Sequence, residues 1–203
     1  MKSHRAFFVL KQLIISNILI SVMFRLLACF AFSLLAFVAT SSIAGDNVSV
    51  DVSYANEIYS TKLSTTLNAK PDAIYRLLTS YDELNLFSRL IQKSKLLPNG
   101  HLQLHLKVCF IFICFDKQQT LKLTISKRSI TGEIIPEYSD FTYGWLKWTL
   151  TNHNNATLIN FDSEITPNFW IPPFIGTLLI QYKLKNEAEY SVLQLEKLAN
   201  NRQ

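Results

Sequence analysis

The two cysteines at positions 109 and 114 are the pair whose spacing most directly suggests chemistry. They bracket the apolar tetrapeptide at residues 110–113, and four intervening residues are a common hairpin loop length. On one straight strand the two side chains would point to opposite faces, so a disulfide requires a turn between them. The sequence therefore favours a hairpin closed by a Cys109–Cys114 disulfide. The alternative is one continuous buried strand with two reduced thiols.

Side chains capable of acid–base catalysis are scattered along the sequence. His101 and His105 share one face of a predicted strand, opposite its leucines, and are expected to face solvent. Glu133 and Tyr143 would be the candidate pair inside an apolar cavity, but no motif singles them out. The sequence contains no serine nucleophile elbow, glycine-rich phosphate loop or metal-ligand cluster. This pattern favours a protein without catalytic residues, metal or cofactor over an enzyme.

Alternating apolar and polar residues predict a series of strands. The first covers residues 57–68, where the odd-numbered positions from Tyr59 to Leu67 face one way. Further strands are predicted at 102–108, 116–126, 129–136, 140–151 and 157–166. Residues 45–56 are polar and are predicted to form a loose leader before a single domain at 57–200.

Two short helices and one long helix complete the predicted order. Pro71 suits the first turn of a helix, and residues 83–91 are predicted to form a second short helix. The long helix is predicted over about residues 174–200. Its predicted inward stripe consists of Leu178, Tyr182, Val192, Leu195 and Ala199. One amphipathic helix beside successive antiparallel strands indicates an α+β fold in which the helix covers one sheet face.

The first 44 residues are predicted to be a signal peptide. Residues 26–39 form an uncharged apolar run of the right length for its core, and Ser42-Ile43-Ala44 supplies a cleavage pattern. Because Met23 begins a complete signal of its own, Met23 is a candidate for the natural start. The sequence therefore predicts export, to the periplasm of a bacterial cell. The alternative is an uncleaved N-terminus that anchors the protein to a membrane.

Removal of the signal changes the charge balance of the protein. The whole chain has 20 basic and 15 acidic side chains, and residues 1–44 hold four of the basic ones and no acid. The remainder has 16 basic side chains (20 − 4 = 16) and a net charge of +1. No cationic excess is left to neutralise phosphates, so nucleic-acid binding is not expected. An exported protein also meets an oxidising compartment, which favours the disulfide.

Several stretches resemble the START-like, polyketide cyclase superfamily. Residues 70–78 followed by Tyr81-Asp82 resemble its first helix and the corner after it. Residues 139–144 followed by Trp148, and residues 166–176, are similar to a bacterial exported branch of unknown activity, as is the spaced cysteine pair. The resemblance covers about residues 57–199. It implies the helix-grip fold, a curved antiparallel sheet wrapped around a long C-terminal helix, with an apolar cavity between them.

The resemblance extends to ligand carriers, cyclases and receptors, so function remains to be argued from the site. The favoured function is binding or carriage of a lipid-like or other apolar small molecule in the bacterial envelope. The alternatives are a cyclase or hydrolase-type enzyme acting on a hydrophobic substrate, and a partner-binding domain with a filled core. The sequence gives no indication of oligomeric state. The predicted ligand-contacting residues are Trp148, Phe161, Phe174, Leu178 and Tyr182.

Two apolar segments are predicted to form the cavity entrance. One is the cysteine hairpin with Phe110 and Phe112, and the other, with Phe169 and Trp170, precedes the last helix. In helix-grip proteins the loop before that helix lies near the cavity mouth. Exposed apolar residues at such a place often contact a membrane or a partner, so peripheral membrane contact is expected. The alternative is that both segments fold back onto the domain.

Overall fold

The computed structural model describes residues 48–110, 113–154, 156–172 and 175–202. The chain divides after Ala44 into two compact units, and all the described residues belong to the second, Gly45–Gln203. The predicted signal peptide and the alternative start at Met23 lie outside the described residues. Among the helices that are described, none is both long and apolar enough to cross a membrane.

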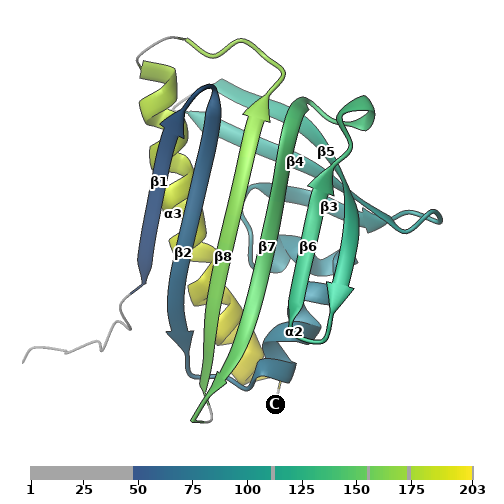
Figure 1. The fold of residues 1–203 in the computed structure, drawn as a ribbon, viewed down its shortest axis with the longest axis vertical. Coiled ribbons are helices and arrows are strands. Elements are labelled where there is room, and N and C mark those ends of the chain that lie inside the picture. The colour runs from purple at the N-terminus through teal and green to yellow at the C-terminus, as the bar shows by residue number, and fades with distance from the viewer. Residues whose placement is uncertain (1–47, 111–112, 155, 173–174, 203) are drawn as a thin grey trace, which may run out of the picture. The chain divides into compact units, whose positions relative to one another are not determined.

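The described strands form one antiparallel sheet in the order β1-β2-β8-β7-β6-β5-β4-β3 (Figure 1). Most neighbours in the sheet are also neighbours in sequence, as expected for strands joined by short hairpins. The exception is β2, which pairs with β8 and so brings the two ends of the domain together. The strands are β1 (Ser49–Ala55), β2 (Ile58–Leu67), β3 (Ile91–Leu96), β4 (His101–Phe110), β5 (Ile113–Ser126), β6 (Ser129–Ile134), β7 (Phe141–His153) and β8 (Ala156–Pro167).

The long helix α3 (Ile175–Asn201) runs along one face of this curved sheet, behind β1, β2 and β8 in the view of Figure 1. The short helix α2 (Pro71–Thr79) packs against α3, and the 3-10 turn η1 (Tyr81–Leu86) follows it. A second 3-10 turn, η2 (Pro136–Tyr138), joins β6 to β7. The predicted α+β helix-grip fold is confirmed.

The alternation predicted for β2 is present in full. Its five odd-numbered residues from Tyr59 to Leu67 are each at most 3% exposed, whereas the residues between them face outward or are partly covered. Helix α2 begins at Pro71, as predicted, and buries Ile74, Leu77 and Leu78. Because these rows face α3 from both sides, they fix the helix over the sheet.

The prediction of a loose leader at residues 45–56 is wrong for residues 49–55, which form β1. This strand pairs with β2 over its whole length, from Ser49 opposite Ser64 to Ala55 opposite Ile58. Asn56 and Glu57 make the turn, both with positive φ (50° and 67°), which suits a tight hairpin. The domain therefore begins before residue 57. β1 alternates Val50, Val52 and Tyr54 with polar residues, and as an edge strand it leaves much of its surface in solvent.

The helix predicted at residues 83–91 is also wrong. The 3-10 turn η1 ends at Leu86, and Ile91 already begins β3 at the other edge of the sheet. Leu84 and Phe87 are buried, as the helical pattern required. Two buried positions three residues apart fit a 3-10 turn as well as an α-helix, so the pattern could not separate them.

Candidate functional site

A cavity of about 480 Å³ lies between the sheet and α3. One wall is the inward row of β4, whose leucines were predicted to share a face. Further walls come from β5, β6, β7, β8, η1 and the first half of α3. Apolar residues that line it include Leu102, Leu104, Leu106, Val108, Leu121, Leu123, Ile130, Leu146, Ile165 and Ile180. The volume lies in the range typical of small-molecule sites, so the core of this domain is not filled.

Trp148 and Phe161, two of the five predicted ligand-contacting residues, both line the cavity. They lie opposite each other on β7 and β8, and their ring centroids are 4.3 Å apart. Both side chains point inward because they occupy the same face as Leu150 and Ile159 further along the strands. Phe174 lies outside the described residues. The two rings, tilted by 37° to each other, form an aromatic section of the cavity wall.

The structure corrects the placement of Leu178 and Tyr182. Each is 67% exposed, and neither lines the cavity. The rest of the predicted stripe is correct, because Val192, Leu195 and Ala199 are buried. The two halves of α3 bury different faces, since the second half packs on the core near α2 and the first half faces the cavity. The residues of the first half that line the cavity include Leu179, Ile180, Lys183 and Leu184.

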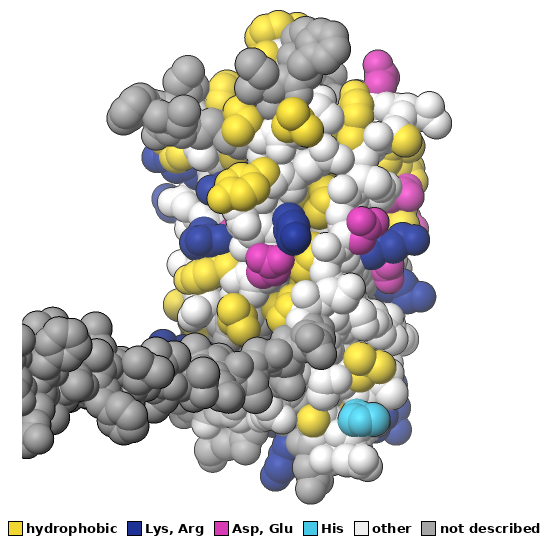
Figure 2. Space-filling view, turned by 90° about the vertical axis from the view of Figure 1, so that its left-hand side faces the viewer, with side chains coloured by type: hydrophobic (Ala, Val, Ile, Leu, Met, Phe, Trp, Pro, Cys, Tyr) yellow, Lys and Arg dark blue, Asp and Glu magenta, His cyan; other side chains and the backbone are white. Residues whose placement is uncertain are grey.

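Leu178 and Tyr182 instead belong to the outer surface of α3. Figure 2 views the side of the molecule that lies at the left of Figure 1, and hydrophobic side chains gather on its upper part above charged ones. Tyr54 on β1 is another exposed aromatic residue near this helix, and its ring lies 4.5 Å from that of Tyr59. The Tyr59 hydroxyl donates to Thr177 Oγ1 at 3.4 Å, which ties β2 to the start of α3.

The predicted entrance residues Phe169 and Trp170 lie at the cavity, in the segment between β8 and α3. The Phe169 ring lies 6.0 Å from that of Phe141 and 4.3 Å from Lys117 Nζ. Trp170 is 79% exposed although it also borders the cavity. This segment therefore has one side toward the cavity and one toward solvent. Phe112 lies outside the described residues.

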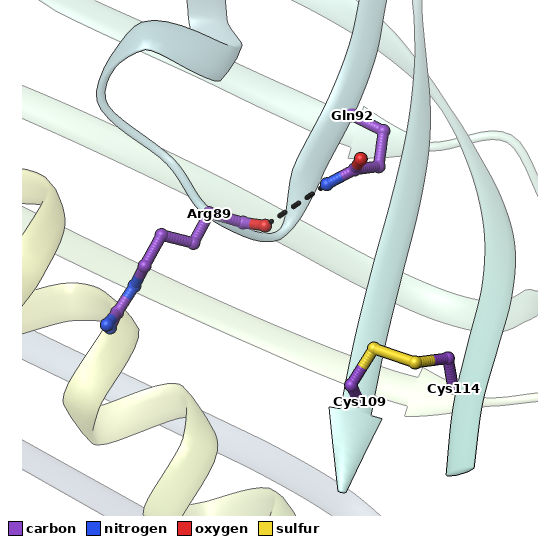
Figure 3. The surroundings of a disulfide bond; sticks show 4 residues. All are labelled: Arg89, Gln92, Cys109 and Cys114. Carbon is purple, nitrogen blue, oxygen red and sulfur yellow. Dashed lines mark hydrogen bonds between the residues drawn. A yellow bond between two sulfur atoms is a disulfide. The ribbon is translucent and has the colours of Figure 1, made fainter. Parts of the chain in front are cut away.

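Cys109 and Cys114 form a disulfide between β4 and β5 (Figure 3). The two residues are directly opposite each other in the ladder, with their Cα atoms 4.0 Å apart. The predicted hairpin is therefore confirmed, and the continuous strand with reduced thiols is wrong. The ladder extends one pair beyond the disulfide, to Phe110 opposite Ile113, so the connection is shorter than the expected four residues.

Sequence reasoning missed a buried polar cluster around Glu187 on α3. Glu187 lines the cavity and is 7% exposed. Its Oε1 accepts hydrogen bonds from Ser88 Oγ at 2.8 Å, from the Arg89 amide at 2.7 Å and from the Leu90 amide at 3.3 Å. Its Oε2 accepts one from Arg89 Nε at 3.2 Å. Figure 3 shows the Arg89 side chain extending across to α3.

These contacts make Glu187 an anchor between α3 and the segment that joins η1 to β3. A general base needs a free lone pair directed at its substrate, whereas this carboxylate is occupied by protein donors. The available signal was the spacing of Glu187, four residues after Lys183 on the cavity face of α3. A charged residue on a buried helix face requires a partner, and the partner here is almost a hundred positions away.

Tyr81 contributes a second polar feature of the cavity wall. Its hydroxyl is buried and has no hydrogen-bond partner among the described residues. Burial raises the pKa of the Tyr81 phenol above its usual 10.0, with a smaller contribution from the nearby Tyr75. The hydroxyl therefore stays neutral at physiological pH.

The side chains considered for catalysis do not meet in the cavity. His105 is exposed on β4, and Glu133 is exposed on β6. Tyr143 is 44% exposed, and its hydroxyl donates to Glu164 Oε2 at 3.0 Å. This hydrogen bond raises the pKa of the Tyr143 phenol. The Glu133 and Tyr143 pair therefore forms no acid–base site.

The fold and cavity define a helix-grip protein, and comparison with known families agrees. The sequence profile of the family described as "Polyketide cyclase / dehydrase and lipid transport" matches residues 67–183, more than half of the chain. The chain belongs to this family. A comparison with curated protein sequences finds no match.

Solved structures share the fold at low sequence identity. A START superfamily protein from Mycobacterium smegmatis aligns with a TM-score of 0.57 and 12% identity, over 71% of this chain and 99% of its own. A STAR-related lipid transfer protein from Xanthomonas axonopodis aligns with a TM-score of 0.54 and 14% identity, over 76% of this chain and 99% of its own. The Zhui aromatase/cyclase from a Streptomyces strain aligns with a TM-score of 0.54 and 13% identity, over 71% of this chain and 95% of its own.

Proposed function

We propose that this protein binds and carries a lipid-like or other apolar small molecule in its internal cavity. The observation that carries the proposal is the 480 Å³ cavity with a predominantly apolar lining. An apolar molecule that moves from water into such a cavity gains about 25 cal/mol per Å² of surface buried. The aromatic pair Trp148 and Phe161 supplies an aromatic contact surface.

The entrance in this proposal is the segment between β8 and α3. Phe169 packs toward the cavity while Trp170 is largely exposed, and this arrangement suits a segment that moves aside to admit a ligand. Exposed aromatic residues at a cavity mouth also suit transient insertion into a membrane surface. Peripheral membrane contact by Trp170 is thus part of the proposed function.

We place this activity in the bacterial envelope. The support is the predicted signal peptide at residues 1–44 and the Cys109–Cys114 disulfide, a bond typical of oxidising compartments. An uncleaved N-terminus would keep the same domain in the envelope but fixed to a membrane. Cell fractionation, with mass measurement of the recovered N-terminus, distinguishes the two forms. Recovery of the protein only in the cytoplasm would contradict the envelope proposal.

Native mass spectrometry of protein purified from cells that express the full chain tests the proposed function directly. We expect an added mass that organic extraction removes and that is identified as a lipid or another apolar molecule. A cavity-filling variant, Leu104→Trp, should lose this mass while keeping the far-ultraviolet circular dichroism of the parent. Repeated recovery of empty protein, together with no binding of any apolar probe, would refute the proposal.

A further inference from the structure

The charged side chains of the cavity wall carry a further inference about the ligand. Among the described lining residues these are Lys117 on β5, Lys183 on α3 and Glu187 on α3. The negative charge of Glu187 is already compensated by Arg89, whose Nε lies 3.2 Å from its Oε2, and by Ser88 and two backbone amides. Lys117 is partly compensated by Asp140, whose Oδ1 lies 3.9 Å from its Nζ, so the excess positive charge of the wall rests mainly on Lys183.

Lys183 has no ion-pair partner among the described residues. No described carboxylate lies within 4.0 Å of its Nζ, and Glu187, one turn further along α3, is engaged elsewhere. The contrast with Lys185 is informative, because that lysine pairs with Glu189 at 3.9 Å and does not line the cavity. Lys183 is thus an ammonium group that borders an apolar cavity and has no counter-ion within the part of the chain that the structure describes.

Lys117 occupies an inward position of β5 beside the entrance. Its Nζ lies 4.3 Å from the Phe169 ring centroid and 3.9 Å from Asp140 Oδ1. The second distance is too long for a hydrogen bond, and the other oxygen of Asp140 accepts from the Gln118 amide at 2.7 Å. Lys117 is thus paired with Asp140 as loosely as Lys185 is with Glu189, and because this contact is not a hydrogen bond, its ammonium donors can still bind another acceptor near the entrance.

From these charges we infer that the ligand is an anionic amphiphile, with an apolar body and one carboxylate or phosphate head group. Lys183 is its principal anion partner, and Lys117 is a second one nearer the entrance. The inference rests on the proposed function and names the ligand class of that same cavity. Lys183 is only partly buried, and a lysine–carboxylate or lysine–phosphate pair formed there is a charge-assisted hydrogen bond.

Displacement of a neutral apolar fluorescent dye from the protein recovered from cells that express the full chain tests this inference. The competitors are a long-chain fatty acid, the alcohol of the same chain, an alkyl phosphate of the same chain and inorganic phosphate, all at neutral pH. We expect at least one anionic amphiphile to bind roughly tenfold more tightly than the alcohol. Tighter binding of the fatty acid identifies a carboxylate head group, and tighter binding of the alkyl phosphate identifies a phosphate. Inorganic phosphate should not displace the dye, because it lacks the apolar body.

Substitutions of the lysines test whether they cause the tighter binding of the anionic amphiphile over the alcohol. Lys183→Gln should remove most of the preference for the anion by weakening anion binding far more than alcohol binding, and Lys117→Gln should remove a smaller part. Lys185→Gln, on the same helix but outside the cavity, should behave like the parent. Lys183→Arg keeps the cation and should keep the preference, which provides a second test if the glutamine variant does not fold.

The ways in which the inference could fail are distinguishable. Equal affinity for the alcohol and both anions would overturn the inference and leave the proposed function intact. The inference is likewise overturned if the preference persists in the double variant Lys117→Gln, Lys183→Gln, or if inorganic phosphate alone displaces the dye. If neither the dye nor any competitor binds to the folded protein, the proposed function itself fails.

Discussion

Glu187 Oε1 on α3 lies 2.8 Å from Ser88 Oγ, in the segment between η1 and β3. Because the same carboxylate also accepts from the Arg89 and Leu90 amides, one buried side chain holds the long helix beside the far edge of the sheet. The residue that anchors α3 therefore also forms part of the cavity wall.

Replacement of Glu187 tests this anchor. Glu187→Ala should lower the free energy of unfolding by about 3 kcal/mol, because it leaves Ser88, Arg89 and two amides without their acceptor. Glu187→Gln should lose less, since it keeps one carbonyl oxygen. Urea unfolding followed by circular dichroism measures both values. Glu189→Ala, a change at an exposed ion pair on the same helix, should stay within about 0.5 kcal/mol of the parent.

The disulfide should stabilise the hairpin modestly. The loop-entropy relation gives roughly 2 kcal/mol for a closed ring as short as residues 109–114. The double variant Cys109→Ser, Cys114→Ser should lose about that much in urea unfolding under non-reducing conditions. Dithiothreitol should lower the stability of the parent but not of the variant. Two freely reactive thiols in protein recovered from the cell envelope would contradict the bond.

Gly144 on β7 has no room for a side chain. A Cβ there would lie 2.6 Å from Ile134 Cδ1 and 2.7 Å from the Glu164 backbone oxygen, and the backbone of the neighbouring strand cannot move aside. Gly144→Ala should therefore cost about 1–3 kcal/mol of unfolding free energy. Gly132→Ala is the matched control, because its closest contact is Leu121 Cδ1 at 3.3 Å. Equal thermal stability of the two variants would contradict the argument.

The Tyr81 hydroxyl should cost stability, since it is buried without a described partner. Tyr81→Phe is expected to raise the free energy of unfolding by about 1 kcal/mol, whereas Tyr138→Phe, at a 62% exposed position, should leave it unchanged. A stability loss in Tyr81→Phe would mean that the hydroxyl has a partner, such as a bound ligand.

The same residue gives a pH dependence. The pKa of Tyr81 is raised above 10.0 in the folded protein, so above pH 10 the unfolded chain loses its phenolic proton first. Because the folded state then binds more protons, stability falls as the pH rises above 10. Thermal unfolding between pH 9 and 11, values set by that pKa, should show a shallower decline in Tyr81→Phe. An identical slope would show that Tyr81 does not contribute.

Membrane contact should depend on the entrance. Trp170 is 79% exposed and borders the cavity, so Trp170→Asp should reduce co-flotation with phospholipid vesicles severalfold, because it places a charge at the proposed apolar interface. Leu193→Asp is the control, since Leu193 is also exposed but lies about 27 Å along α3 from its start. Flotation of neither the parent nor the variants would contradict membrane contact.

The sequence predicted most strands because their burial is local information. The alternation in β2 and β4 follows directly from the pleat, and Pro71 marked the start of α2. β1 and β3, the two edge strands of the sheet, were missed. β1 does alternate, with Val50, Val52 and Tyr54 between polar residues, but it is short and largely exposed, whereas the polar residues of β3 leave a weak alternation and only pairing with β4 distinguishes it from a loop.

The candidate site was predictable only in part. Trp148 and Phe161 were identified because inward aromatic residues of adjacent strands face the helix. Leu178 and Tyr182 were misplaced because the buried stripe on α3 changes face along the length of the helix. The sequence of the helix or of the strands alone does not specify which helix face packs against the sheet. Glu187 was missed because its partners lie almost a hundred residues earlier.

By itself the sequence predicted an α+β fold, favoured the cysteine hairpin over a continuous strand and showed apolar rows that could surround a ligand, because each depends on residue types at short spacing. The tertiary structure alone decided that these rows enclose a cavity of about 480 Å³, that Lys117 and Lys183 border it, and that Glu187 is neutralised within it. Empty space and charge balance depend on distances between elements far apart in the chain, and those distances exist only after α3 is packed against the sheet.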